Sequence, residues 1–144
     1  MKEIRLHGIG GQGTVKAGEM LVNAAVKDGL SGNSIPFFGF ERQGAPVSSF
    51  VRLDKHKIRP KNQVYHPNCL LVMDSTVMQS TNVFEGIQND TYLILNTDIT
   101  DPALLRLPKD VKHVALINGT KVALDLIGKP LPNTVMLGAF AKLT

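Results

Sequence analysis

The chain has 144 residues, of which 43% are hydrophobic, and a formal net charge of +4 at pH 7. This length supports one sizeable hydrophobic core and excludes two ordinary domains. No apolar run approaches the roughly 20 residues of a membrane-spanning helix, and the first residues lack the apolar region of a signal peptide. We therefore expect a single domain over residues 1–144 that acts in the cytoplasm, away from membranes.

The chain begins with a pattern typical of a strand that enters a tight loop. In residues 3–7, Ile4 and Leu6 alternate with other side chains, and the glycine-rich residues 8–13 follow at once. The next apolar residues recur at helical spacing, which predicts a helix over about residues 13–28. These apolar residues are Ala17, Met20, Leu21, Ala24 and Ala25.

The middle of the chain lacks this periodicity. Residues 35–46 contain two prolines, two glycines and three phenylalanines, which predicts an irregular loop, and loops of this length are usually functional or form interfaces. From Val47 to Leu53, apolar and polar residues alternate. Together with a turn at residues 54–55 and a return through residues 57–59, this alternation predicts an antiparallel hairpin at the edge of a sheet.

Three later apolar runs predict a parallel sheet. Residues 69–73, 92–95 and 114–117 are continuously apolar rather than alternating, as expected of strands that helices cover on both faces. The elements follow one another in a β-α-β-α order. We therefore predict a three-layer, Rossmann-like α/β domain whose sheet is mostly parallel, with a short antiparallel edge or hairpin.

Helices are predicted between and after these strands. One covers residues 75–85, with Asp74 or Ser75 as N-cap and Gly86 as its end, and another covers residues 119–127, ended by Gly128. A last helix begins near residues 132–134 and reaches Thr144 without a C-cap signal. We expect this of a chain that is cut short at its C-terminus.

The single cysteine and the clustered charges limit the possible chemistry. Cys69 lies in an apolar run, so we expect a buried, reduced thiol, and it can form neither an internal disulfide nor a cluster-binding motif. His7 and His66 have no ligand companions at useful spacing, so we expect structural roles and no metal site. The basic run of residues 52–61 is a solvated hairpin or a phosphate-facing or subunit-facing patch. Nucleic acid is not expected, because the run lacks interleaved aromatic residues.

The glycine loop predicts an anion site. Gly8, Gly10 and Gly13 match the pattern G-x-G-x-x-G between a strand and a helix, where free N–H groups and the helix dipole favour an anion. A dinucleotide site would need an acidic residue about 20 residues further on. Residues 33–35 offer none, which disfavours NAD. A second interpretation is that the glycines only allow close packing, but the extra Gly11 and Gln12 go beyond what packing requires.

Three separated segments resemble one known family. They are residues 7–18 (HGIGGQGTVKAG), residues 36–47 (PFFGFERQGAPV) and residues 132–139 (PNTVMLGA). In this order they resemble the gamma subunits of 2-oxoacid:ferredoxin oxidoreductases, of which pyruvate synthase is one. The middle segment is more similar to the pyruvate-type subunits than to the 2-oxoglutarate type. Subunits for 2-oxoglutarate, phenylglyoxylate, indolepyruvate or branched-chain 2-oxoacids stay open as alternatives.

The resemblance implies a role inside an enzyme complex of anaerobic metabolism. Such a complex decarboxylates a 2-oxoacid on thiamine diphosphate and Mg²⁺, passes electrons through [4Fe-4S] clusters to ferredoxin, and transfers the acyl group to coenzyme A. This chain lacks the motifs for thiamine diphosphate and for clusters. The resemblance therefore implies that those groups lie on alpha, beta and delta partner subunits, and that this chain has no catalytic residue and no activity alone.

What the resemblance leaves to this chain is coenzyme A. N–H groups of residues 11–14, the Thr14 hydroxyl and the Lys16 ammonium suit its phosphates, whereas Glu41 and Arg42 form a site contact, an internal ion pair or part of an interface. Phe37, Phe38 and Phe40 are core residues or pack against a partner. A stand-alone nucleotide-binding or coenzyme A-binding module and a purely architectural subunit are the alternatives. The expected cofactor-binding residues are Gly8, Gly10, Gly11, Gln12, Gly13, Thr14, Lys16, Glu41 and Arg42.

Overall fold

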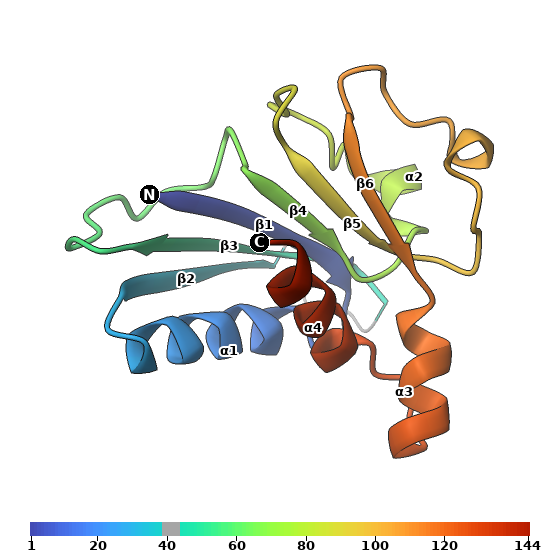
Figure 1. Cartoon of the computed structure of the whole chain (residues 1–144), viewed down its shortest axis with the longest axis horizontal. Coiled ribbons are helices and arrows are strands. Elements are labelled where there is room, and N and C mark those ends of the chain that lie inside the picture. The colour runs from blue at the N-terminus through green and yellow to red at the C-terminus, as the bar shows by residue number, and fades with distance from the viewer. Residues whose placement is uncertain (39–43) are drawn as a thin grey trace.

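The computed structural model describes residues 1–38 and 44–144, and these residues form a six-stranded sheet with helices on its faces (Figure 1). The strands are β1 (Lys2–Ile9), β2 (Ser31–Phe38), β3 (Pro46–Asp54), β4 (Cys69–Val72), β5 (Tyr92–Asn96) and β6 (His113–Ile117). The helices are α1 (Thr14–Lys27), α2 (Val77–Ser80), the 3-10 helix η1 (Pro102–Leu105), α3 (Gly119–Ile127) and α4 (Asn133–Leu143). Every helix in these ranges is too short or too polar to cross a membrane.

The sheet is mixed, with one strand running against the others. Its order is β2-β3-β1-β4-β5-β6, and β1, β4, β5 and β6 pair in parallel. Strand β3 is antiparallel to both of its neighbours, β1 and β2. The structure therefore confirms the predicted Rossmann-like α/β class, with a mostly parallel sheet and an antiparallel part at one side.

The predicted partner of β3 was wrong. Residues 57–59 form no strand, and β3 pairs instead with β2, from Ser31↔Asp54 to Phe38↔Val47. The end of β2 includes Ile35 and Pro36, which were predicted to begin an irregular loop. Proline is tolerated there because β2 is an edge strand and needs no N–H donor on its free side. The basic residues that follow β3 stay in water instead of forming a hairpin.

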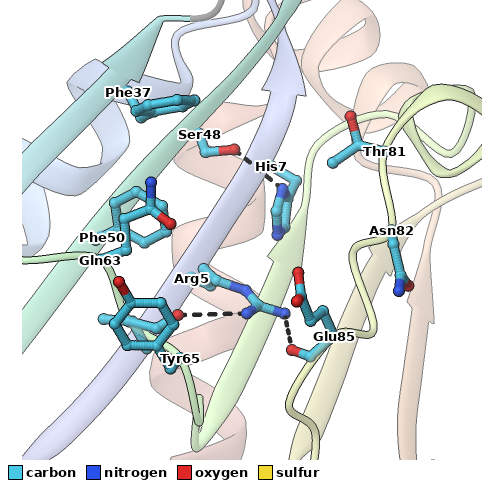
Figure 2. A pocket seen from close by; sticks show the side chains of 11 residues that line it. Arg5, His7, Phe37, Ser48, Phe50, Gln63, Tyr65, Thr81, Asn82 and Glu85 are labelled. Atoms are coloured by element: carbon cyan, nitrogen blue, oxygen red, sulfur yellow. Dashed lines mark hydrogen bonds between the residues drawn. The ribbon is translucent and has the colours of Figure 1, made fainter.

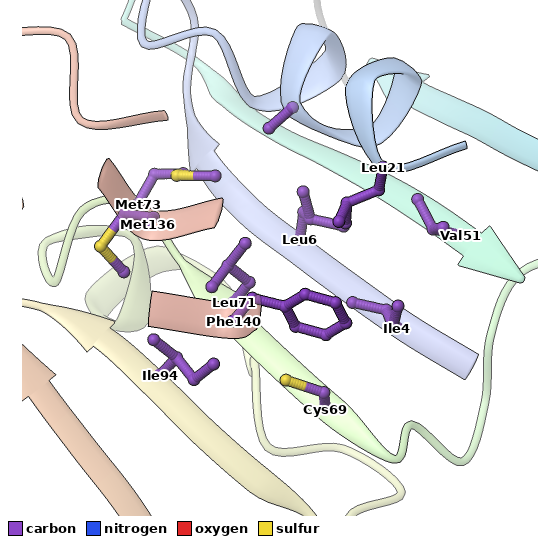
Figure 3. Close-up of a cluster of buried hydrophobic side chains, with 11 residues drawn as sticks. Ile4, Leu6, Leu21, Val51, Cys69, Leu71, Met73, Ile94, Met136 and Phe140 are labelled. Atoms are coloured by element: carbon purple, nitrogen blue, oxygen red, sulfur yellow. The ribbon is translucent and has the colours of Figure 1, made fainter. Parts of the chain in front are cut away.

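Two clusters of buried side chains hold the layers together. Helices α1 and α4 cover one face of the sheet, while α2 and the segments around it cover the other face of β4 and β5. Figure 3 shows the first cluster, in which Leu6, Leu71 and Ile94 of neighbouring strands meet Met136 and Phe140 of α4. Each such buried side chain contributes about 1.5 to 3 kcal/mol.

The single cysteine belongs to this first cluster, as predicted. Cys69 is 1% exposed, and burial raises the pKa of its thiol to about 12. The thiol is therefore protonated at neutral pH and acts as a small apolar side chain.

Local capping explains which helix predictions were right. Helix α3 has the predicted bounds, because the Asn118 side chain accepts a hydrogen bond from Lys121 N at 3.1 Å and Gly128 ends the helix with a φ of 71°. Helix α2 is much shorter than the predicted residues 75–85. The Asp74 carboxylate holds the N–H of Thr76 at 2.9 Å, and the backbone turns to an extended conformation at Thr81.

An extended segment, residues 60–65, crosses the sheet face opposite α1 and is called the strap below. Asn33 of β2, Arg52 of β3 and Arg5 of β1 donate to main-chain oxygens of the strap at 2.7 to 3.3 Å. Arg52 also pairs with Glu3, with 2.8 Å between Nε and Oε1. The strap thus replaces a helix over this half of the sheet, and it is attached by polar side chains together with the buried side chain of Val64.

The contacts of the strap predict that two arginines close in sequence differ strongly in their contribution to the free energy of unfolding. Replacing the buried Arg52 by glutamine leaves Glu3 and two main-chain oxygens without their donor, so we expect a loss of about 3 kcal/mol in the free energy of unfolding. Arg59 is exposed, and Arg59→Gln should change this quantity by less than about 0.5 kcal/mol. Urea denaturation of both variants measures the difference, and equal losses would contradict this role of Arg52.

Candidate functional site

The glycine loop lies at the carboxyl end of β1, the strand from which the chain adds strands first on one side and later on the other. From β1 the chain passes through α1 to β2 on one side, and the later strand β4 pairs with the other side of β1. In open α/β sheets, ligands bind in the crevice beyond the carboxyl ends of the strands where the strand order switches in this way. The topology therefore makes this loop the first candidate site.

Gln12 fixes the conformation of the loop. Its Oε1 accepts a hydrogen bond from Ile9 N at 2.9 Å, and its Nε2 donates to Asp74 Oδ2 at 2.6 Å. Main-chain bonds add to this, from Gly10 N to Ala45 O at 2.9 Å and from Gln12 N to Ile9 O at 3.2 Å. The side chain of Gln12 is therefore occupied at both ends, and it ties the end of β1 to the end of β4.

Asp74 is stabilised as a carboxylate at this junction. Burial alone raises its pKa, but hydrogen bonds from the Thr76 hydroxyl and N–H and from Gln12 outweigh burial, so the pKa of Asp74 is lowered from its usual value. The negative charge is thus shared among three donors that belong to the protein. This leaves the N–H groups on the α1 side of the loop available to a different anion.

The first helical turn of α1 presents free donors. Gly13 precedes the helix with a φ of 79°, and the first turn contains no acidic residue. Within residues 1–38 and 44–144, five successive or nearly successive N–H groups here have no acceptor. They belong to Gly11, Gly13, Thr14, Val15 and Lys16. Such groups and the helix dipole favour an anion at this position.

A hollow of about 380 Å³ lies beside these donors and is called the glycine-loop hollow below. Phe38 at the end of β2 and Val47 at the start of β3 form its apolar side. Lys16 lies at its edge and pairs with Glu19, with 3.2 Å between Nζ and Oε2, and both side chains are largely exposed. An exposed pair of this kind contributes at most about 1 kcal/mol, so Lys16 can exchange Glu19 for a ligand.

Parts of all three resembling segments meet at the loop. Ala45, from the second segment, accepts the Gly10 N–H, as described above. Asn133, from the third segment, packs on Gly13 so closely that a Cβ there would lie 2.5 Å from Asn133 Nδ2. Segments that are about 30 and 120 residues apart in the chain thus build one site, and Gly13 is needed both for its positive φ and for this contact.

The structure separates the predicted site residues into three groups. Five of them line the glycine-loop hollow, namely Gly10, Gly11, Gly13, Thr14 and Lys16. Gly8 and Gln12 support the loop instead: a Cβ on Gly8 would collide with the hydroxyl of Thr14, and Gln12 bonds inside the protein. Glu41 and Arg42 lie outside the described residues, as does Phe40.

Thr14 differs from its predicted role in one respect. Its side chain is only 3% exposed, and its hydroxyl has no hydrogen-bond partner among the described residues. The hydroxyl lies next to Gly8, whereas the N–H of Thr14 is one of the five donors without an acceptor beside the hollow. Asn133 and Asp74 were missed as site residues. Asn133 was present in a recognised segment, but nothing in the sequence pairs it with Gly13.

No group of three or more histidine, cysteine, aspartate or glutamate side chains within residues 1–38 and 44–144 is arranged to hold a metal ion.

The fold and the loop define the class of protein, a Rossmann-like α/β domain with a glycine-rich loop at its topological switch point. Residues 3–144 match the family model "Pyruvate ferredoxin/flavodoxin oxidoreductase". The chain belongs to this family, within which it is a gamma-type subunit. The resemblance inferred from the three segments is therefore confirmed.

Similar proteins carry names that agree with this membership. Pyruvate synthase subunit PorC of Methanosarcina barkeri is 46% identical over 144 residues, which are 100% of this chain and 78% of that protein. The pyruvate/ketoisovalerate oxidoreductases common subunit gamma of Pyrococcus abyssi is 42% identical, with the same two coverages. The gamma subunit of the NADH-dependent phenylglyoxylate dehydrogenase of Aromatoleum evansii is 44% identical and is covered to 75%.

Solved structures share the fold. The crystal structure of pyruvate oxidoreductase subunit PORC from Thermotoga maritima matches 99% of this chain and 76% of its own, with a TM-score of 0.84 and 34% identity. The 2-oxoglutarate:ferredoxin oxidoreductase from Magnetococcus marinus, described with 2-oxoglutarate, coenzyme A and succinyl-CoA bound, matches 99% of this chain and 24% of its own. Its TM-score is 0.77 at 20% identity, which shows a common fold alone.

The contact between Gly13 and Asn133 predicts a specific pattern of stabilities. Gly13→Ala suffers from the positive φ and from the collision with Asn133, so we expect it to cost more than the roughly 1 to 2 kcal/mol of backbone strain alone. Gly128→Ala has a similar φ with open space around it and should show the strain alone. An Asn133→Ala background removes Nδ2 and Cγ but keeps the Cβ of residue 133 at 3.3 Å from the added methyl, so most of the difference in the free energy of unfolding between the two alanine variants should disappear there. An unchanged difference there would show that Asn133 is not the obstacle.

Proposed function

We propose that this chain is the gamma subunit of a pyruvate:ferredoxin oxidoreductase and that its glycine loop binds phosphate groups of coenzyme A. In this proposal residues 1–144 act as one gamma-type domain in a cytoplasmic complex with alpha, beta and delta subunits. Those partners carry thiamine diphosphate, Mg²⁺ and the [4Fe-4S] clusters. Together they convert pyruvate and coenzyme A to acetyl-CoA and CO₂, and two electrons pass to ferredoxin.

The observation that carries the coenzyme A role is the row of free N–H groups at the start of α1. Coenzyme A has a pyrophosphate and a 3′-phosphate, and the donors of Gly11 and of residues 13–16 border a hollow of about 380 Å³. Phosphates bind helix N-termini in this way because the N–H groups and the helix dipole act together. Lys16 supplies a flexible positive charge at the edge of the same hollow.

The chain's own chemistry supports a positioning role rather than a redox role. A cluster of the [4Fe-4S] type needs four cysteine thiolates, whereas the sequence contains one cysteine, whose pKa is raised to about 12 by burial. Holding the coenzyme A thiol near an acyl intermediate on a partner subunit accelerates transfer by raising the local concentration of the thiol. This contribution needs donors at the correct place and no catalytic side chain.

The choice of 2-oxoacid is carried by the names of similar proteins. Two of the three relatives described above act on pyruvate by name, and this favours pyruvate. The P. abyssi protein is named as common to pyruvate and ketoisovalerate enzymes, and the A. evansii protein belongs to a phenylglyoxylate enzyme. Because one gamma subunit can serve enzymes for two different 2-oxoacids, we infer that the partner subunits select the 2-oxoacid. A subunit for another 2-oxoacid is therefore the second candidate.

The coenzyme A role is tested in the assembled complex with two matched glycine variants. Gly11 has a φ of 94° and Gly128 a φ of 71°, and an added Cβ meets nothing within 4 Å at either position. Gly11→Asp places a carboxylate among the phosphate donors, so we expect the KM for coenzyme A to rise by at least about tenfold, with the KM for pyruvate unchanged. Gly128→Asp should change neither value.

Steady-state rates of pyruvate-dependent ferredoxin reduction give both constants. If the complex with Gly11→Asp assembles normally and keeps the KM for coenzyme A of the unmodified complex, the loop does not bind coenzyme A. In that case the loop only packs, as in the architectural alternative.

A further inference from the structure

A second hollow lies on the opposite side of the sheet from α1, and the glycine loop takes no part in it. It has a volume of about 230 Å³ and is called the Arg5–His7 hollow below (Figure 2). Strands β1, β2 and β3, the strap and the segment after α2 surround it. The residues that line it include Arg5, His7, Phe37, Phe50, Tyr65 and Glu85.

Arg5 is a buried cation without a carboxylate partner. Its side chain donates to Val64 O at 3.3 Å, Val83 O at 2.6 Å and Glu85 O at 2.7 Å, but its Nε has no acceptor. Among the described residues no carboxylate lies within 4 Å of the guanidinium. Burial lowers the pKa of Arg5, and the more distant charge of Glu85 opposes this effect only in part. Buried charges are normally paired, so the guanidinium of Arg5 lacks its usual partner.

His7 adds a second unpartnered nitrogen to the same hollow. The ring is 4% exposed, its Nδ1 lies 3.2 Å from the Ser48 hydroxyl, and its Nε2 has no partner. Burial, and then the charge of Arg5, lower the pKa of His7 to about 3, so the ring is neutral at neutral pH. When Ser48 donates to Nδ1, the ring proton resides on Nε2. Arg5 Nε and His7 Nε2 then both lack an acceptor, and both side chains line the same hollow (Figure 2).

The mouth of the hollow is aromatic and exposed. Phe37 is 50% exposed and Tyr65 is 59% exposed, while Phe50 beneath them is buried, with 6.4 Å between the ring centroids of Phe37 and Phe50. Large aromatic side chains around a pocket with a buried arginine are the composition of interface hot spots.

The surface that leads to the strap is positively charged. Lys55, Lys57, Arg59 and Lys61 are all exposed, and the chain continues from them directly to Tyr65 at the mouth of the hollow. Glu85 is the one carboxylate among the residues that line it. A surface of this charge attracts an acidic partner and speeds its association.

We propose that this face docks an acidic loop of a partner subunit, whose Asp or Glu carboxylate enters the Arg5–His7 hollow and accepts hydrogen bonds from Arg5 Nε and His7 Nε2. The neighbouring part of the loop covers Phe37 and Tyr65, and further acidic residues meet the basic residues of 55–61. The carboxylate gives Arg5 the missing ion pair. This interface rests on the proposed function, in which the chain works as a subunit, and it is separate from the coenzyme A site.

The aromatic rim is tested by the affinity of this chain for a preformed complex of the alpha, beta and delta subunits. Phe37→Ala combined with Tyr65→Ala truncates two half-exposed side chains at the mouth of the hollow, and we expect at least about tenfold weaker binding. Val26→Ala is the control, because Val26 is 55% exposed on α1, on the other side of the sheet. Unchanged affinity of the double variant, with circular dichroism like that of the unmodified chain, overturns the proposal.

The charge contribution is tested separately by association rates at several salt concentrations. Lys57→Glu combined with Lys61→Glu should slow association and reduce its dependence on salt. Lys109→Glu combined with Lys129→Glu changes the net charge equally at two exposed positions elsewhere and should have a smaller effect. Equal effects of the two pairs would show that only net charge matters and would contradict a local acidic partner.

Hydrogen exchange and coenzyme A kinetics separate the two proposals. Amides of residues 63–65 and 81–85 should become protected on assembly, and no change there overturns the docking face. At saturating subunit concentration, the complex with Phe37→Ala and Tyr65→Ala should keep its KM for coenzyme A. The Gly11→Asp chain should instead assemble normally and show a raised KM for coenzyme A. Acetate or pyruvate alone could shift the His7 ring resonances of the free chain, while the Phe37→Ala and Tyr65→Ala chain keeps its affinity for the partner complex. In that case the hollow binds a small acid and the docking proposal fails.

Discussion

The position of β1 between an antiparallel and a parallel neighbour is the constraint on which the rest of the structure depends. Because β3 and β4 flank it on the two sides, β1 is central and its side chains alternate between two different environments. Ile4 and Leu6 face the apolar layer of α1 and α4, whereas Arg5 and His7 face the strap. The same pairing places the glycine loop at the switch point of the sheet. One strand therefore determines both candidate surfaces.

The glycine loop is held by contacts from distant parts of the chain, which gives it a fixed shape before any ligand arrives. Gln12 ties it to Asp74, Ala45 accepts from Gly10, and Asn133 packs on Gly13. Preorganised N–H donors need little rearrangement to bind a phosphate, so more of the interaction energy is available for affinity. The second and third family segments are thereby explained as parts of the same structure as the first.

Much of the fold follows from local sequence signals. The errors in its prediction concern which strand pairs with β3 and where helix α2 ends. The strand before the glycine loop, α1 and α3 were predicted within a few residues, because periodicity and caps such as Asn118 and Gly128 act over short distances. The alternation of residues 47–53 identified a strand but could not show that β2, rather than residues 57–59, is its partner. Helix α2 is short mainly because the backbone becomes extended at Thr81, a change that apolar spacing does not reveal.

The same distinction applies to the candidate site. A strand followed by G-x-G-x-x-G and a helix predicted the loop and its free N–H groups. The contact of Asn133 with Gly13 and the attachment of Gln12 to Asp74 arise only when distant segments meet at the sheet edge. The strap and the Arg5–His7 hollow were not predicted for the same reason, since the three strands that hold the strap are separated in sequence by other elements.

The most direct measurement of the central claim is a cryo-EM structure of the assembled complex with coenzyme A. The account predicts phosphate density within hydrogen-bond distance of the N–H groups of Gly11 and residues 13–16, with Lys16 turned from Glu19 toward it, and the coenzyme A thiol directed at the thiamine-binding partner. Coenzyme A bound with its phosphates on other subunits, and no ligand density beside this loop, would contradict it.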